Sequence, residues 1–257
     1  MRNVLVLGGT LQASALALAL ARRGERAVLS YAGRVAQPRQ QPIAVRCGGF
    51  GGVQGLAAYV REHAVTHVVD ATHPFAAIMS SHAVAACERA QVPLLALTRP
   101  PWRAQPGDRW REVPDIAAAV AALDDAPQRI LLALGRLHLA AFAARPQHHY
   151  IVRLVDPPQG PPVLPNCSVI VSRGPFDLAG DTALLREQGV QLVVCKNSGG
   201  EGAQAKLEAA RLLGLPVLMV ARPALPARAE ATEVAEVLDW LDGRATHRPA
   251  PGSERGA

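Results

Sequence analysis

The chain has 257 residues, enough for one large domain or two modest ones, each with a hydrophobic core of its own. Hydrophobic residues make up 49% of the chain and charged residues 19%, a composition that excludes an intrinsically disordered protein. No apolar run reaches the ~18–20 residues of a membrane span, so no membrane partner is expected. The four cysteines lack Cys-x-x-Cys spacing, which argues against a metal site and a disulfide framework and predicts a reducing, cytoplasmic location.

The formal net charge is +6, and the sequence leaves two explanations open. One is a compositional preference for Arg, and the other is a polyanionic partner. The basic residues form no block and are not interleaved with aromatic residues, which argues against nucleic acid as that partner. A phosphorylated cofactor, or a small ligand with many carboxylates, suits scattered arginines better.

Strands and helices are expected to alternate along the first half of the chain. The N-terminus runs directly into an apolar strand and a turn, which is unlike a signal peptide. Expected strands cover residues 3–7, 26–30, 43–46, 66–70 and 94–97, and expected helices cover residues 11–23, 53–63 and 75–90. This alternation predicts an α/β fold with a parallel sheet and helices on both faces.

The second half of the chain repeats this plan. Four segments recur in the same order at an offset of about 125 residues; Leu192-Val193-Val194-Cys195, for example, matches His67-Val68-Val69-Asp70. We therefore expect two Rossmann-like halves at residues 1–126 and 127–243, then a loose tail at residues 244–257. A cofactor and substrate cleft is expected between the halves. Duplicated halves of this kind can also exchange a strand.

The first candidate site is the turn Gly8-Gly9-Thr10 between a strand and a helix. Glycines let a phosphate approach the backbone, and a helix N-terminus supplies free N–H groups and the positive end of the dipole. The turn lacks the third glycine of a full Gly-x-Gly-x-x-Gly motif, and an ordinary strand–helix turn is the alternative. We predict a cofactor phosphate here.

The end of the second expected strand indicates which nicotinamide cofactor binds. NAD sites usually place Asp or Glu about 20 residues past the first glycine, on the ribose hydroxyls. Ser30 lies 22 residues past Gly8, no acid is present, and Arg34 follows. Because an arginine can pair with a 2′-phosphate, Ser30 and Arg34 favour NADPH over NADH. The alternative is that Arg34 is a solvated surface residue.

The segment Asp70-Ala71-Thr72-His73-Pro74-Phe75 follows an expected buried strand. Polar residues at this sheet edge point into the expected crevice, which makes Thr72 a candidate cofactor contact. His73 is the residue of this segment suited to act as an acid or base near neutral pH. The alternative is that Thr72 or His73 only caps the next helix, with Pro74 in its first turn.

The matching edge of the second half is Cys195-Lys196-Asn197-Ser198-Gly199-Gly200. Its glycines expose backbone N–H groups that suit an anion. Lys196 and Lys206, the two lysines of the chain, flank this turn, and the strand edge with Arg173 is expected nearby. Cys195 has no evident His partner and is expected to be a buried structural thiol.

Four segments together resemble the precorrin-6A reductase family of cobalamin biosynthesis: residues 4–10, 70–76, 196–200 and 216–223. The resemblance covers about residues 3–242, and the segments that start at Asp70 and Lys196 are its most specific parts. It implies NADPH-dependent reduction of one macrocycle double bond of precorrin-6A to give precorrin-6B. The reaction needs one hydride and one proton, and His73, another crevice donor or solvent must supply the proton.

The resemblance also implies a tetrapyrrole substrate with many carboxylates, which a basic protein with anion-binding turns suits. The expected cofactor contacts are Gly8, Gly9, Thr10, Ser30, Arg34 and Thr72. The expected substrate contacts are Arg99, Arg173, Lys196, Asn197, Ser198 and Lys206. A monomer is expected, with transient hand-over to other corrin-pathway enzymes.

Three alternatives remain at this point. A cobalt-precorrin-6A reductase of the anaerobic route would keep the chemistry and change the substrate. A non-catalytic carrier of a nucleotide or tetrapyrrole would have the same anion-binding turns without needing nicotinamide. A nucleic-acid-binding protein would explain the net charge alone and predicts steeply salt-dependent DNA binding.

Overall fold

The computed structural model describes residues 1–32, 40–155, 157, 160, 164–172, 174 and 176–244. The predicted site residues Arg34 and Arg173 and the predicted tail from residue 245 lie outside these ranges. The chain forms two compact units: unit 1 joins Met1–Arg99 with the chain from Ala224 onward, and unit 2 is Pro100–Pro223. No helix within the described ranges is long and apolar enough to cross a membrane.

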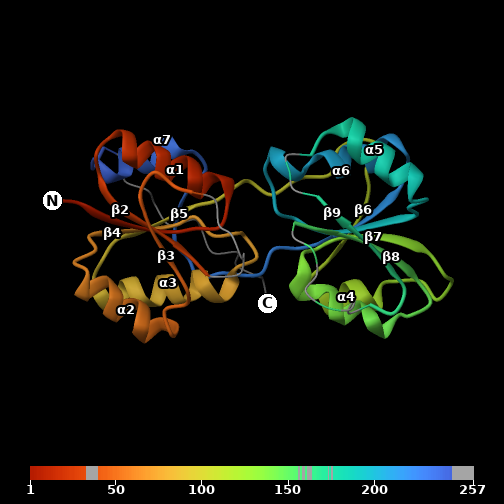
Figure 1. Ribbon diagram of the computed structural model, residues 1–257, viewed down its shortest axis with the longest axis horizontal. Coiled ribbons are helices and arrows are strands. Elements are labelled where there is room, and N and C mark those ends of the chain that lie inside the picture. Colours follow the sequence, from red (N-terminus) through yellow and green to blue (C-terminus); the bar gives the residue numbers. More distant parts are fainter. Residues whose placement is uncertain are drawn as a thin grey trace, which may run out of the picture. The chain divides into compact units, whose positions relative to one another are not determined.

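Unit 1 contains a six-stranded parallel sheet with helices on both faces (Figure 1). The strand order β12-β5-β4-β1-β2-β3 is that of a doubly wound dinucleotide-binding fold, whose topological switch point lies between β1 and β4. Its elements are β1 (Asn3–Leu7), α1 (Leu11–Arg22), β2 (Arg26–Tyr31), β3 (Ala44–Cys47), α2 (Gly52–Glu62), β4 (His67–Asp70), α3 (Ala77–Ala90), β5 (Leu94–Leu97), β12 (Ala229–Ala231) and α7 (Val234–Leu241).

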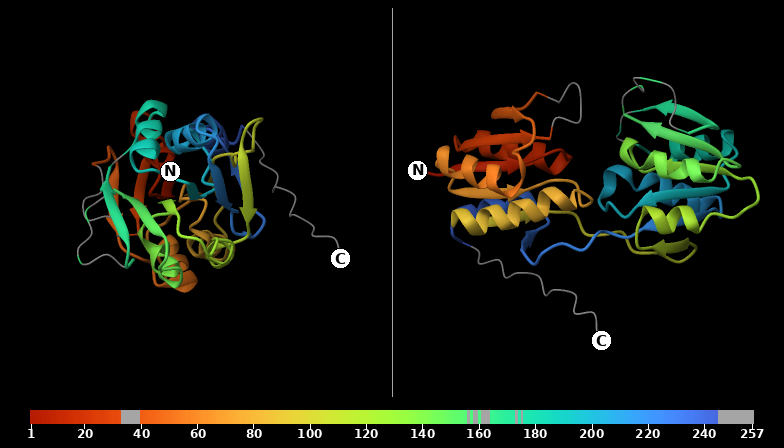
Figure 2. Two further views of the ribbon diagram at one scale, coloured as in Figure 1. Left: turned by 90° about the vertical axis from the view of Figure 1, so that its right-hand side faces the viewer. Right: turned by 90° about the horizontal axis from the view of Figure 1, so that it is seen from below.

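Helices cover both faces of this sheet, which explains why β1 is an unbroken apolar run with all five residues buried. On one face Leu20 of α1 and Val237 of α7 belong to one apolar cluster. On the other face Leu56 of α2 and Cys87 of α3 belong to a second cluster. Figure 2 shows α2 and α3 side by side across that second face. Because helices cover both faces, a ligand can reach the sheet at the carboxyl ends of its strands and not across either face.

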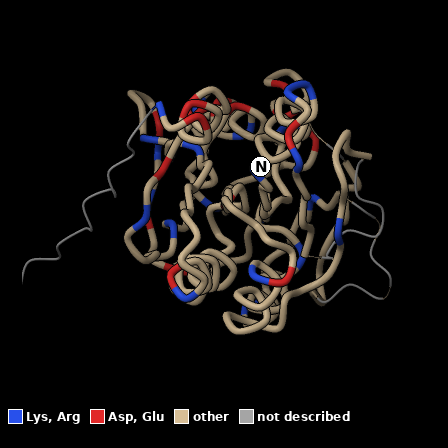
Figure 3. The backbone as a smooth tube through the Cα atoms, turned by 90° about the vertical axis from the view of Figure 1, so that its left-hand side faces the viewer, with Lys and Arg blue, Asp and Glu red and all other residues tan. Residues whose placement is uncertain are grey.

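An ion-pair cluster fixes the end of α7 to the start of the chain. The Asp242 carboxylate accepts hydrogen bonds from Arg2 at 2.7 Å and from Arg23 at 2.6 Å. These two hydrogen bonds lower the pKa of Asp242. Elsewhere Lys and Arg are interspersed with Asp and Glu along the described backbone (Figure 3). The excess of basic residues is therefore spread over the described backbone and does not form one continuous basic segment.

Unit 2 has a second six-stranded parallel sheet, in the order β6-β11-β10-β7-β8-β9. If β7 is equated with β1, the order is the same as in unit 1, with β6 in the place of β12. The predicted pair of similar α/β halves is confirmed. The elements are β6 (Arg109–Val113), α4 (Ile116–Ala121), β7 (Arg129–Ala133), β8 (His149–Leu154), β9 (Cys167–Val171), α5 (Leu178–Glu187), β10 (Leu192–Lys196), α6 (Ala205–Leu212) and β11 (Pro216–Val220), with 3₁₀ helices at Arg136–Ala144 and Glu201–Ala203.

The two units exchange their outermost strands. β6 follows β5 along the chain but pairs with β11, whereas β12 follows β11 but pairs with β5. The boundary predicted near residue 126 therefore differs from the structure, which divides the chain after Arg99 and after Pro223. Strand pairing causes the difference, because the order of elements along the chain does not reveal which sheet an edge strand joins.

Candidate functional site

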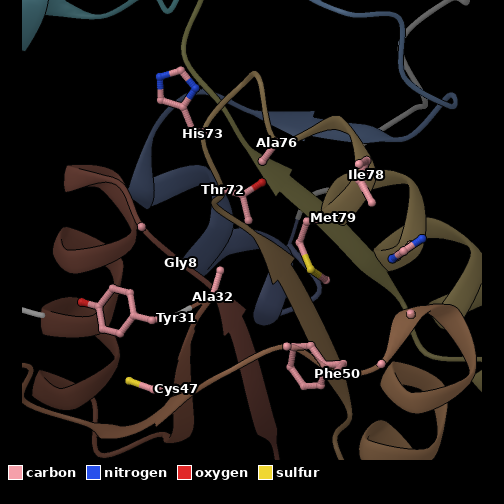
Figure 4. Close-up of a pocket in the computed structure, with 15 residues that line it drawn as sticks. Gly8, Tyr31, Ala32, Cys47, Phe50, Thr72, His73, Ala76, Ile78 and Met79 are labelled. Atoms are coloured by element: carbon pink, nitrogen blue, oxygen red, sulfur yellow. The ribbon is translucent and has the colours of Figure 1, made fainter. Parts of the chain in front are cut away.

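A cavity of about 510 Å³ lies in unit 1 at the carboxyl edge of the sheet. Its wall includes Gly8 and Gly9 after β1 and Thr72 and His73 after β4, the two strands that flank the switch point. In open α/β sheets, ligands bind in this crevice. Figure 4 shows the labelled lining residues Gly8, Tyr31, Ala32, Cys47, Phe50, Thr72, His73, Ala76, Ile78 and Met79.

The glycine turn brings the backbone close to this cavity. The Gly8 N–H donates to Ser30 O at 2.9 Å, and a Cβ at Gly8 would lie 2.5 Å from Leu29 Cδ1. Gly9 has a φ of +127°, a conformation that L side chains rarely adopt. The N-terminus of α1 therefore meets the cavity with two residues that carry no side chain, as a backbone phosphate site requires.

Thr10 stabilises this turn through its side chain. Its Oγ1 accepts from Ala13 N at 3.1 Å, which caps α1, and donates to Ala71 O at 2.8 Å. The hydroxyl thus ties the turn after β1 to the end of β4. A phosphate contact by Thr10 would have to come from its backbone.

The end of β4 carries a buried carboxylate that orients Thr72. One oxygen of Asp70 accepts from Thr72 N at 3.1 Å and from Thr72 Oγ1 at 2.6 Å. The other accepts from Arg228 Nη1 at 2.6 Å. Helix α3 begins at Ala77 with Ala76 as its N-cap and no side-chain cap, so the expectation that Thr72 or His73 caps it is wrong. The extra turn before the helix leaves both side chains at the cavity wall.

Two histidines line the cavity. His73 Nδ1 accepts from Phe75 N at 3.2 Å, which in the neutral ring places the proton on Nε2. His82, four residues after Ile78 on α3, is also part of the wall and was not among the predicted site residues. The helical spacing of Ile78, Met79 and His82 is the sequence signal that would have identified it.

Arg46 is a second residue that the sequence analysis missed. It lies on β3 opposite Ser30, and its Nη1 donates to Ser30 Oγ at 2.7 Å and to Gly48 O at 3.0 Å. Its Nη2 donates to Gly49 O at 3.2 Å, and the guanidinium lies 3.8 Å from the centre of the Phe50 ring. Arg46 therefore shapes the glycine-rich loop on which Phe50 enters the cavity wall.

In unit 2, two of the predicted substrate residues hold Trp102. The Asn197 side chain accepts from Trp102 N at 2.7 Å and donates to Trp102 O at 3.0 Å. The buried Lys206 ammonium donates to Ala203 O and lies 4.7 Å from the centre of a Trp102 ring. Both side chains thus have a structural role that their position beside a glycine turn does not reveal.

The remaining predicted substrate residues fall in different places. Lys196 is the last residue of β10. Ser198 lies in the turn that follows, and its backbone carbonyl accepts a hydrogen bond from Arg222 Nη2 at 3.1 Å. Arg99 belongs to unit 1, where burial lowers the pKa of its guanidinium. Lys196, Asn197, Ser198 and Lys206 thus all belong to unit 2, whereas Arg99 belongs to unit 1.

Cys195 behaves as the sequence predicts. It is buried, and burial raises the pKa of its thiol to about 11. Its Sγ contacts Met219 Sδ at 3.7 Å. A thiol in these apolar surroundings is inert.

Comparison with known proteins gives consistent results. The family described as precorrin-6x reductase CbiJ/CobK matches residues 3–242. A precorrin-6A reductase of Rhodobacter capsulatus is 57% identical over 249 residues, covering 96% of this chain and 99% of the relative. A cobalt-precorrin-6A reductase of Priestia megaterium is 29% identical over 232 residues, covering 86% and 90%. A solved structure of CobK precorrin-6A reductase matches with a TM-score of 0.91 and 55% identity, over 96% of this chain and 98% of that one.

Proposed function

Since this chain belongs to the precorrin-6x reductase family, we propose that it reduces precorrin-6A to precorrin-6B with a hydride from NADPH and one proton. The identity of 57% to a precorrin-6A reductase over nearly the full length of both chains supports that substrate. Membership of this family shows a reductase of cobalamin biosynthesis.

The cavity at the switch point is the observation that carries the cofactor assignment. Gly8 and Gly9 leave room at the N-terminus of α1 for a diphosphate, and none of the described residues that line the cavity carries a carboxylate that would repel one. The geometry of this chain therefore fits a dinucleotide. When bound, the nicotinamide supplies the hydride.

The chain's own residues would position the reactants and exclude water. Asp70 fixes the Thr72 hydroxyl at the cavity wall, while Phe50, Ile78 and Met79 make part of that wall apolar. The proposed proton donor is His73. Proton delivery requires its imidazolium form, in which Phe75 N–H loses Nδ1 as an acceptor.

Lys196 and Ser198 are the proposed substrate contacts of unit 2. They end β10 and begin the glycine turn, where backbone N–H groups suit carboxylates. Arg99 and Arg173 remain proposed contacts. Asn197 and Lys206 are better understood as residues that hold Trp102 and so support this edge.

The test begins with fluorescence titrations of the full chain with NADPH and NADH, followed by turnover of precorrin-6A. We expect tight NADPH binding, weaker NADH binding and stoichiometric NADPH oxidation. Cofactor binding without turnover would favour a carrier instead. His73→Ala should lower the rate of turnover, and the residual rate should no longer depend on the titration of a histidine. His82→Ala removes the other cavity histidine and should keep the pH profile of the wild type. Full turnover with an unchanged pH profile in His73→Ala would eliminate His73 as the donor.

A second substrate follows from the relatives named cobalt-precorrin-6A reductase. Their identity of 29% or less is well below the 57% to the precorrin-6A reductase of Rhodobacter capsulatus, which supports precorrin-6A as the preferred substrate. Parallel assays with metal-free and cobalt-loaded substrate compare the two. A higher kcat/KM for the cobalt form would reverse the preference.

A further inference from the structure

We propose that the carboxyl edge of strands β7, β8 and β9 in unit 2 binds the tetrapyrrole substrate, with exposed aliphatic side chains against the ring and Arg136 on a carboxylate. The inference rests on the proposed function and adds to it a binding surface in unit 2. The aliphatic residues are Leu137, Val155, Val171 and Leu178, and this set together with Arg136 is called the β7–β9 edge surface.

The distribution of exposed apolar side chains is the first argument. The described part of unit 2 has five large hydrophobic residues that are exposed: Leu137, Val155, Val171, Leu178 and Leu212. Val155 directly follows β8, Val171 is the last residue of β9, and Leu178 begins α5 after β9. Leu137 lies in the 3₁₀ helix after β7. Single exposed apolar residues are ordinary, whereas four at one sheet edge indicate a binding surface.

Strand pairing places these residues on neighbouring strands. β7, β8 and β9 are adjacent in the sheet, and all three run parallel (Figure 1). Leu154 at the end of β8 is the register partner of Val171. Because adjacent strands lie ~4.8 Å apart, the ends of three strands span about 10 Å. The edge is therefore wide enough for the flat face of a tetrapyrrole ring.

Arg136 adds a positive charge beside the apolar residues. It is exposed and precedes Leu137 directly. Its Nη2 donates to Pro157 O at 3.0 Å, which holds the side chain across the ends of β7 and β8. A guanidinium has five N–H donors and binds a carboxylate through two of them in a planar fork. Arg136 is thus positioned to bind an anionic arm of a ligand that covers Leu137.

The described acidic residues near this edge already have partners of their own. The Asp181 carboxylate accepts from Arg153 Nη2 at 2.6 Å in a buried ion pair. The Asp177 carboxylate accepts from Gly180 N at 2.7 Å and caps α5. The guanidinium of Arg153 and the N-terminus of α5 therefore offset these two negative charges.

The same edge is a poor fit for a second dinucleotide. In unit 1, β1 is followed by Gly8 and Gly9 and then by an α-helix, which suits a phosphate. In unit 2, β7 is followed by Gly135 and Arg136 and then by a 3₁₀ helix. An arginine thus stands where the second glycine of the turn would be needed. An apolar surface beside a cation instead suits a ligand with an apolar ring and carboxylate arms.

The first experiment tests the apolar part of the surface in the full chain. Tryptophan fluorescence measures the Kd for precorrin-6A without NADPH, and steady-state assays measure its KM. Leu137→Gln should raise both by about 5- to 20-fold, because the ring loses the burial of a leucine side chain. The Kd for NADPH should change less than about twofold. The matched control is Leu212→Gln, at the exposed end of α6, which should leave all three values unchanged.

The second experiment tests the charge. Arg136→Met should raise the KM for precorrin-6A by about 10-fold, because a charge-assisted hydrogen bond is lost. Arg136→Lys keeps the charge and should recover part of the loss. The control Arg186→Met removes an exposed charge from the last turn of α5 and should leave the KM unchanged. Leu137→Gln keeps the proposal falsifiable if Arg136→Met, which also loses the bond to Pro157, does not fold.

The outcomes separate failure of the surface from failure of the proposed function. An unchanged Kd and KM for precorrin-6A in folded Leu137→Gln would overturn the β7–β9 edge surface. Equal losses in Leu137→Gln and Leu212→Gln would overturn it as well, because the effect would not depend on position. In both cases the proposed reductase activity stands. A wild-type chain that neither binds nor reduces precorrin-6A would overturn the proposed function itself.

Discussion

The carboxylate of Asp70 accepts a 2.6 Å hydrogen bond from Arg228, which lies 158 residues further along the chain. The two side chains are 1% and 7% exposed, so the ion pair is buried. The other oxygen of Asp70 holds Thr72. A residue next to β12 thus supports the loop that lines the cavity at the switch point.

Removal of Arg228 should therefore affect both stability and binding. Arg228→Met leaves the Asp70 charge buried without a counter-ion, which typically costs about 3–5 kcal/mol. Urea unfolding measures this loss, and NADPH affinity should fall with it because Thr72 loses its support. The control is Arg244→Met, whose exposed side chain makes only 3.8 Å ion pairs, with Asp239 and with Asp242, and which should cost under about 1 kcal/mol. The Asp70→Asn change should recover part of the loss in Arg228→Met, and no recovery would contradict the ion-pair explanation.

A substitution at Gly199 should destabilise unit 2 by a close backbone contact. A Cβ there would lie 2.1 Å from Pro100 O. Gly214→Ala is a matched control, because Gly214 has a φ of +64° against +67° for Gly199 but nothing within 4 Å. Both variants bear the strain of about 1 kcal/mol for a left-handed residue, and only Gly199→Ala bears the clash. Equal melting temperatures for the two variants would refute the argument.

His148 should make unit 2 sensitive to acid. The ring is fully buried, and burial followed by the nearby charge of Arg145 lowers its pKa. The folded state therefore holds fewer protons than the unfolded chain below pH ~6.5, so stability is retained above this pH and lost as the pH falls. His148→Asn, whose amide oxygen can still accept from Gln128 N, should lose less stability between pH 8 and pH 5.5 than the wild type. The control His63→Asn, at an exposed site, should keep the wild-type dependence.

Cys47 should report on cofactor binding. It is exposed and lines the cavity, whereas Cys87 and Cys195 are buried and burial raises the pKa of their thiols to about 12 and about 11. Iodoacetamide should therefore modify Cys47 first, and NADPH should slow that reaction. Mass spectrometry of the alkylated peptides measures both effects. Unchanged Cys47 labelling at saturating NADPH would show that the nucleotide does not occupy this cavity.

Much of unit 1 follows from local sequence. The alternation of apolar runs and helical periods predicts its strands, and the carboxyl ends of parallel strands meet at one edge. The sequence therefore predicts Gly8, Gly9, Thr72 and His73 at one edge, and all four lie in one cavity wall.

The parts that were missed depend on pairing and packing across long distances. Arg46 faces Ser30 only because β2 and β3 pair in a particular register. Arg228 meets Asp70 only because β12 returns to the first sheet. Asn197 and Lys206 have the composition of an anion site, yet they contact Trp102, about 100 residues earlier in the chain. No local pattern encodes such partners.

The exchange of outer strands also sets the order in which the two units are completed during synthesis. Unit 2 is one continuous stretch that lies between β5 and β12 of unit 1. A ribosome therefore makes all of unit 2 before it makes Arg228 and β12. Unit 1 begins first and is completed last, with an unpaired edge at β5 and an Asp70 that lacks its counter-ion until the chain passes residue 228. On the growing chain, the cavity at the switch point therefore lacks the support of Arg228 until after all of unit 2 has been made.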